Sequence, residues 1–208
     1  MKLLKTICLT IVLFASSARA QEEKSSDSAV VVITKYGIGV KVGFNFATVS
    51  EGDLANAADS RASFYIGANY EVPIIPDVFS VQPEVIYSQQ GFEKRYTIDG
   101  TRHKSIYKLN YFSIPILARY YVVRGFSLEA GPQFSYKVNE NFDRDETDTE
   151  QLTLNSTNDI DIGFVAGLTF QFESGFFVNG RYNRGFKEIF EDSDVKNVVI
   201  QMGVGYKF

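Results

Sequence analysis

The C-terminal stretch from Asn197 to Phe208 alternates between apolar and small or polar side chains up to a terminal phenylalanine. Even-numbered positions from Val198 onward are apolar, and odd-numbered positions mostly are not. An alternation of period two is typical of a strand with two different faces. Because hydrocarbon cannot satisfy backbone N–H and C=O groups, a strand that faces lipid must be paired on both sides. This ending therefore predicts a closed barrel.

Earlier parts of the chain repeat the same alternation. The repeating segments are residues 37–47, 62–72, 78–91, 107–122, 126–138, 160–172 and 175–187. Together with the C-terminal strand they make eight. We therefore predict an all-β fold, an eight-stranded antiparallel up-and-down transmembrane β-barrel.

The lengths of the connections carry independent information. Long connections at 48–61, 92–106 and 139–159 alternate with short ones at 73–77, 123–125 and 173–175. Outer-membrane barrels have short periplasmic turns and longer external loops. Since the strand number is even, we expect both termini on the periplasmic side of the cell outer membrane.

The N-terminus is typical of an exported protein. Residues 1–20 contain Lys2 and Lys5, then an apolar run, then Ala18-Arg19-Ala20, which predicts a secretory signal peptide cleaved before Gln21. Residues 21–35 open polar and charged and are predicted to be a periplasmic lead-in to a barrel domain of residues 36–208.

Cleavage would leave a chain with restricted chemistry. The only cysteine, Cys8, would be removed, so the mature protein could form no disulfide. The formal charge of −4 would become −7 (−4 − 3) with the loss of Lys2, Lys5 and Arg19. This acidic balance argues against nucleic acid as a partner.

The polar face distinguishes a membrane barrel from a soluble, lipocalin-like barrel of the same strand number. Its charged members are Lys41, Arg119, Lys137, Arg181 and Lys207 with Glu71, Glu84, Glu129 and Asp161. Such a nearly balanced set suits a narrow lumen, because an unpaired buried charge costs several kcal/mol. The sequence therefore favours an apolar face that meets lipid.

Seven of these residues are predicted to form a lumenal charge network: Lys41, Glu84, Arg119, Glu129, Lys137, Asp161 and Arg181. The network can be interpreted as a plug that stabilises a closed barrel or as the lining of a small pore. Eight strands enclose a lumen that side chains just fill, which favours the plug.

Several segments resemble the PorT-like outer-membrane β-barrel family of Bacteroidetes-type bacteria. The matching stretches are Gly39 to Asn45, Val81 to Gly91, Tyr111 to Leu117 and Gly131 to Phe134. The resemblance implies a membrane barrel and, for the founding member, an accessory role in protein secretion. Tyr206 and Phe208 resemble the C-terminal aromatic signal that barrel-assembly machinery reads during insertion, so loss of Phe208 should lower insertion.

Candidate chemistry is sparse. His103 and Ser105 resemble the His-x-Ser pair of lipid A deacylases, but His103 is predicted to lie in a turn-like loop. The acidic loop 139–150 could bind Ca²⁺, although a solvated loop is the favoured interpretation. We predict no enzyme, no cofactor and no metal site.

The function that follows is a structural or binding barrel. Its external loops would contact lipopolysaccharide, ligands or partner proteins, and the barrel-assembly machinery would be a partner during insertion. The alternative is an accessory of a secretion or assembly system with an envelope protein as partner. A third hypothesis, a lipid A-modifying enzyme, rests on His103 alone.

Overall fold

A computed structural model describes residues 36–208 with gaps at 51–57, 99–100, 144–157 and 190–193. The predicted signal peptide and lead-in, residues 1–35, lie outside the described residues. The strands are β1 (Gly37–Ser50), β2 (Ala58–Ile75), β3 (Phe79–Ile98), β4 (Thr101–Val123), β5 (Phe126–Asp143), β6 (Ile160–Gln171), β7 (Phe176–Glu188) and β8 (Lys196–Lys207). Within this part of the chain, no helix is long and apolar enough to cross a membrane.

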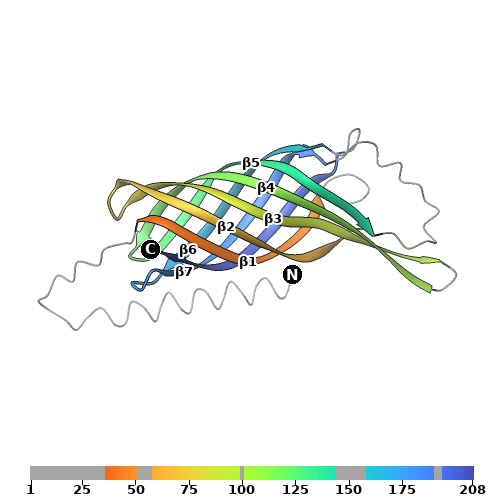
Figure 1. Ribbon diagram of the computed structural model, residues 1–208, viewed down its shortest axis with the longest axis horizontal. Helices are drawn as coiled ribbons and strands as arrows, with labels where there is room; N and C mark the ends of the chain where they lie inside the picture. Colours follow the sequence, from red (N-terminus) through yellow and green to blue (C-terminus); the bar gives the residue numbers. More distant parts are fainter. Residues whose placement is uncertain (1–35, 51–57, 99–100, 144–157, 190–193) are drawn as a thin grey trace, which may run out of the picture. The chain divides into compact units, whose positions relative to one another are not determined.

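The eight strands close into one antiparallel barrel in chain order (Figure 1). Each strand pairs with its sequence neighbours, and β1 pairs with β8. This confirms the predicted fold class. One circuit of the register passes through Val72, Val81, Ala118, Ala130, Ala166, Tyr182, Ile200, Phe46 and Ala62. The circuit returns to β2 ten residues from its start, and this stagger tilts the strands relative to the barrel axis.

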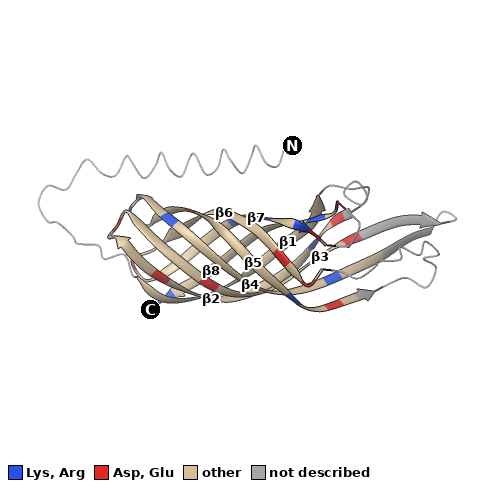
Figure 2. Ribbon diagram, turned by 90° about the horizontal axis from the view of Figure 1, so that it is seen from above, with Lys and Arg blue, Asp and Glu red and all other residues tan. Residues whose placement is uncertain are grey.

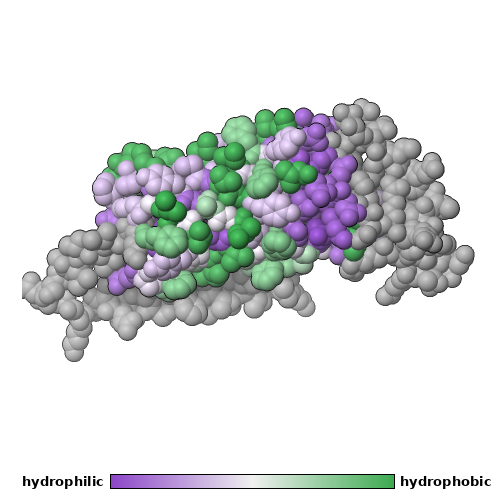
Figure 3. Space-filling model, in the orientation of Figure 1, coloured by the Kyte–Doolittle hydropathy of each residue, from purple (hydrophilic) through white to green (hydrophobic). Residues whose placement is uncertain are grey.

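The barrel is apolar outside and polar inside. On β1, Val40, Val42 and Phe44 are exposed, whereas Lys41 and Asn45 between and beyond them are buried. Figure 3 shows apolar side chains over the flank of the barrel and hydrophilic ones gathered toward the end from which β3 and β4 project. The polar face predicted from the alternation is therefore the lumen.

The two ends of the barrel differ. At one end, which we call the short-turn end, brief turns join β2 to β3, β4 to β5 and β6 to β7. β1 begins at this end and β8 ends there, and the Phe208 N–H donates to the Ile38 carbonyl at 3.0 Å. We call the opposite end the long-strand end.

The prediction of a long loop at 92–106 is wrong. β3 continues to Ile98 and β4 begins at Thr101, so the two strands form a long hairpin. His103 lies in β4 opposite Tyr96, and the turn-like loop predicted for it is wrong as well. Polar residues suggested a loop, but outside hydrocarbon a strand can carry polar residues on its exposed face.

The acidic loop begins later than predicted. β5 runs to Asp143, so the first residues of 139–150 belong to a strand, while residues 144–150 lie outside the described part.

Because proline has no backbone N–H, the sequence predicts local bulges at Pro83, Pro115 and Pro132, and the structure has none at these three positions. The strand register is the same on both sides of each of these prolines. The register shifts lie elsewhere, for example between Asn110 and Tyr111. A proline removes one ladder donor. Here the strands lose that hydrogen bond without inserting a residue.

Close approach of β1 and β8 depends on glycine. A Cβ on Gly43 would overlap the carbonyl oxygen of Met202 and lie 2.6 Å from the Cα of Gly203. Both contacts are with backbone atoms and cannot be relieved by rotating a side chain. The seam that closes the barrel therefore has no room for a methyl group at this position.

We predict that Gly43→Ala destabilises the barrel by about 1–3 kcal/mol, because an added methyl forces the backbone apart. Urea titration in detergent, followed by the heat-modifiable shift on gels, measures the change. Gly180→Ala is the matched control, since no atom lies within 4 Å of a Cβ at that position. Equal effects of both substitutions would contradict the account of the seam.

Candidate functional site: the charged lumen

Seven charged side chains form a continuous chain of ion pairs across the lumen. In order of contact they are Lys41, Glu84, Arg181, Glu129, Arg119, Glu71 and Lys207. Opposite charges alternate along the whole chain. All seven residues are buried, with at most 5% of their surface exposed.

Arg181 lies at the centre of this chain. Its two terminal nitrogens donate to the two oxygens of Glu84 at 2.6 and 2.8 Å, and its Nε donates to Glu129 at 2.5 Å. Lys41 donates to Oε2 of Glu84 at 2.5 Å, and Gln82 donates to Oε1 of Glu84 at 2.6 Å. The bidentate fork of an arginine with a carboxylate is among the stronger protein hydrogen-bond arrangements.

The chain continues toward the short-turn end. Arg119 lies 3.5 Å from Glu129 and donates to Glu71 at 2.8 Å. Lys207 forms an ion pair with Glu71, whose other oxygen accepts hydrogen bonds from Ser80 and Tyr121. Each carboxylate in the lumen is thus held by at least two donors.

These ion pairs join strands that are not neighbours in the sheet. Glu84 of β3 and Arg181 of β7 meet across the lumen. The seven residues come from every strand except β6, and β6 joins through Thr169, which donates to Glu129 at 3.2 Å. Backbone ladders connect only adjacent strands, so the side-chain network braces the barrel across its interior.

Five of the seven residues predicted as a lumenal network come together in this chain: Lys41, Glu84, Arg119, Glu129 and Arg181. Lys137 lies apart and contacts Glu140 at 2.7 Å and Asp159 at 3.3 Å. Asp161 accepts a hydrogen bond from the backbone N–H of Lys187 at 3.4 Å. Both belong to the long-strand end.

The prediction left Glu71 and Lys207 out of the network, although both were recognised on the polar face. Each lies at the end of its strand, where sequence spacing cannot tell whether the side chain is inside or beyond the lumen. Alternation supplied the signal that they face inward. Only the register, which brings the short-turn ends of β2, β4 and β8 together, completes the chain.

The interior changes character toward the long-strand end. A cluster of buried apolar side chains lies there, beside a few buried polar ones such as Gln90 and Asn197; its members are Val49, Phe92, Tyr107, Leu109, Tyr111, Ile189 and Val195. Phe92 and Tyr107 stack with ring centroids 4.5 Å apart and planes at 13°. We call this group the apolar cap. The lumen therefore passes from a charged zone to a core like that of a soluble protein.

Toward the same end, the outward-facing side chains change from apolar to polar. On β4, Phe112, Ile114 and Ile116 are exposed and apolar, whereas Asn110 and Lys108 occupy the next outward positions. Figure 2 shows charged residues both within the body of the barrel and near its long-strand end. The switch marks the level at which the barrel leaves hydrocarbon.

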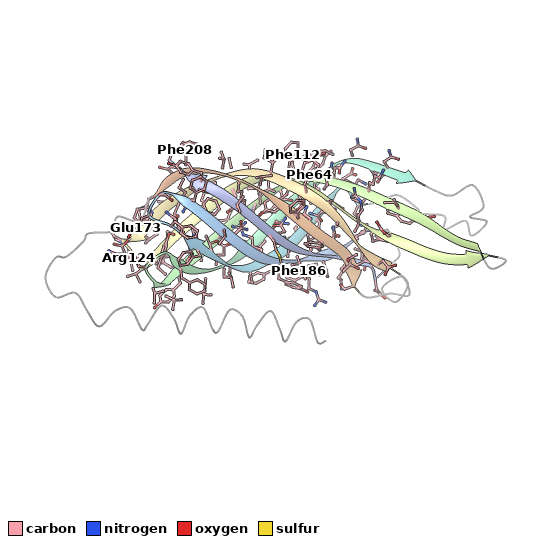
Figure 4. All side chains as sticks on the ribbon, turned by 90° about the horizontal axis from the view of Figure 1, so that it is seen from below. Phe64, Phe112, Arg124, Glu173, Phe186 and Phe208 are labelled. Atoms are coloured by element: carbon pink, nitrogen blue, oxygen red, sulfur yellow. The ribbon has the colours of Figure 1, made fainter. Side chains whose placement is uncertain are left out.

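Exposed aromatic residues flank the apolar band. Figure 4 shows Phe64, Phe112 and Phe186 on the outside of the barrel away from the short turns, and Phe208, Arg124 and Glu173 at the short-turn end. Such girdles are typical of residues at membrane interfaces. About ten residues at ~3.3 Å each, tilted ~40°, span roughly 25 Å, which is the height of an outer-membrane apolar band.

Chemistry beyond charge pairing has little support. Within the residues that the structure describes, no group of three or more His, Cys, Asp or Glu side chains is placed to hold a metal ion. The lumenal carboxylates Glu71, Glu84 and Glu129 are all engaged by cations. What the arrangement can do is hold a narrow lumen closed.

A closed barrel with an apolar belt, aromatic girdles and a filled polar lumen defines the class of outer-membrane β-barrels. Comparison with known proteins gives the family. The chain belongs to the family described as the outer membrane protein beta-barrel domain, whose model matches residues 15–191. No curated protein matches the chain.

The solved structures that the chain is similar to are distant in sequence. Neisserial surface protein A is 14% identical, with a TM-score of 0.56 over 84% of this chain and 99% of that one. Ail of Yersinia pestis in a bilayer nanodisc is 18% identical, with a TM-score of 0.49 over 84% and 100%. OprG of Pseudomonas aeruginosa is 17% identical, with a TM-score of 0.44 over 86% and 99%. At these identities the first comparison supports the fold alone.

We predict that Arg181→Met lowers the free energy of unfolding by about 3–5 kcal/mol, because Glu84 and Glu129 would lose their shared buried cation. Arg124→Met, in the exposed β4–β5 turn, should cost less than about 1 kcal/mol. Urea titration in detergent compares the two. A cost for Arg181→Met as small as that for Arg124→Met would show that the network contributes little.

Proposed function

We propose that this protein is a closed, non-catalytic outer-membrane barrel whose long-strand end forms a binding platform outside the cell. In this orientation the short turns and both termini are periplasmic, after removal of residues 1–20 as a signal peptide. The platform contacts lipopolysaccharide, a surface ligand or a partner protein.

The apolar cap is the observation that carries this proposal. Strands that leave the bilayer normally need no apolar interior, yet Tyr107, Leu109 and Tyr111 are each at most 2% exposed. The outward residues of the same stretch, Lys108 and Asn110, are polar. An apolar interior with a polar exterior is the arrangement that stabilises folded structure in water. This supports an ordered platform above the lipid.

The filled lumen supports the proposal of a closed barrel that anchors the platform, and it argues against a channel. Charged pairs fill the barrel toward the short-turn end, and the apolar cap fills the other end. Ions that crossed would have to break buried pairs and then pass between the apolar side chains of the cap. Both steps carry large desolvation costs.

Basic side chains near the aromatic girdle at the long-strand end support contact with lipopolysaccharide phosphates. Arg184 occupies an outward position on β7 between Tyr182 and Phe186, and Lys196 lies close by at the start of β8. Lys108 occupies an outward position on β4 beyond Phe112. Long basic side chains at a membrane interface can extend toward anionic headgroups.

The finer assignment to PorT-like proteins of Bacteroidetes-type bacteria is part of the proposal and rests on the sequence resemblance. Insertion by barrel-assembly machinery through Tyr206 and Phe208 belongs to it as well. Phe208 is 68% exposed and packs edge-on against Tyr206 at 5.4 Å, which leaves its ring accessible to a receptor. An accessory role in secretion has no further support among the described contacts.

Leu109→Asp tests the platform. We expect the substitution to bury an unpaired charge in the apolar cap and to unfold the strand ends, while the barrel keeps its heat-modifiable mobility. Trypsin should then cleave the β3–β4 hairpin at its basic residues. Lys108→Asp, one residue away on the outward face, should leave the hairpin resistant.

Two outcomes would overturn the proposal. Equal resistance of the Leu109→Asp and wild-type hairpins would remove the platform. Steady ion conductance of the wild-type protein in planar bilayers would identify a pore and remove the closed anchor.

Arg184→Glu tests the contact with lipopolysaccharide. We expect this charge reversal to reduce the rise in melting temperature that purified lipopolysaccharide gives the detergent-solubilised protein, because an anionic side chain repels phosphate. Arg124→Glu, at the short-turn end, should leave that rise unchanged. An undiminished rise for Arg184→Glu would place the contact elsewhere.

A further inference from the structure

Two of the short turns carry exposed apolar side chains that lie beyond the aromatic girdle of the short-turn end. The residues are Ile74, Ile75, Val78, Val122 and Val123, which are 57%, 53%, 41%, 49% and 61% exposed. They come from the β2–β3 and β4–β5 connections and the strand ends beside them. We call them the turn patch. Soluble turns rarely present so many large apolar residues together.

The turn patch lies further from the centre of the barrel than the girdle does. Tyr120 of β4 is a girdle residue paired with Phe79, and Val122 and Val123 follow it. On the other side of the barrel, Phe172 is followed at once by Glu173 and Ser174. Apolar surface therefore extends further toward the tips of the short turns on the β2 to β5 side than on the β6 to β7 side.

Hydrogen bonds hold the turn patch against the barrel. The Tyr121 N–H donates to the Val78 carbonyl at 2.9 Å and joins the two turns, and the Val78 N–H donates to Ile75 at 3.0 Å. The Asp77 N–H donates to the Tyr36 hydroxyl at 2.6 Å, which ties the β2–β3 turn to the start of β1. The patch is thus an ordered surface.

The turn patch is also continuous with the surface that meets lipid. Val72 leads along β2 to Ile74 and Ile75, and Tyr120 leads along β4 to Val122, without a charged residue in either stretch. Figure 3 shows apolar side chains, together with hydrophilic ones, at the end of the barrel where the β2–β3 turn lies. The charged residues of the same turns, Asp77 and Arg124, lie beside the patch and are exposed, so they can stay among the lipid headgroups while the apolar side chains enter the acyl-chain region.

We propose that the turn patch is embedded in the periplasmic leaflet of the outer membrane, at the boundary between headgroups and acyl chains. The barrel axis then leans so that the β2 to β5 side lies deeper than the β6 to β7 side. The partner of this surface is lipid. This inference rests on the membrane location and on the proposed orientation with the short turns periplasmic, but not on the binding platform at the other end, so the embedding and the platform can fail separately.

Single tryptophans test the embedding, because the chain contains no tryptophan of its own. Ile75→Trp and Val123→Trp report on the turn patch, and Glu173→Trp is the matched control in the polar β6–β7 turn. Each variant is folded into phosphatidylcholine vesicles with plain or brominated acyl chains, and the heat-modifiable shift verifies folding. We expect both patch tryptophans to emit at shorter wavelength than the control and to lose most of their emission in brominated lipid.

Three results would overturn the inference. Water-like emission without quenching at both patch positions would place the turns in the aqueous phase. Short-wavelength emission without quenching would mean that protein, such as a second copy of this chain, covers the patch. Equal quenching of all three tryptophans would mean that the barrel does not lean. If Ile75→Trp does not fold, Ile74→Trp serves in its place.

Discussion

Hydrocarbon offers no hydrogen-bond partner to a backbone N–H or C=O group, and the rest of this structure depends on that constraint. The pairing of β1 with β8 meets it, since it removes the two edges that an open sheet would expose. Gly43 faces Gly203 across that seam and allows the strands to come together. Once the sheet is closed, alternate residues must face either lipid or a narrow interior.

The narrow interior explains the charges. A lumen of eight strands has little room for water, so polar side chains inside it must satisfy one another. Glu84 and Arg181 do so from strands on different sides of the barrel, and Glu129 links them to Arg119. The resulting network braces the barrel internally, which suits a rigid anchor for structures outside the membrane.

Most of the fold could be predicted from alternation, because the bilayer enforces opposite chemistry on successive residues of each strand. The prediction failed where that rule ends. On β4 the apolar residues change phase between Tyr111 and Phe112, from facing inward to facing outward. A change of phase was the available signal for a strand that continues into water. Polar composition instead suggested that residues 92–106 form a loop.

The sequence by itself determined the number of strands, their two faces and the short turns, since each is a local consequence of residue type along one strand. Only the tertiary structure decided which charges meet. The stagger of ten residues brings Lys207, Arg119 and Glu71 together and leaves Lys137 and Asp161 apart. Stagger is a property of the closed sheet, and no single strand encodes it, because every strand reads the same from its own alternation.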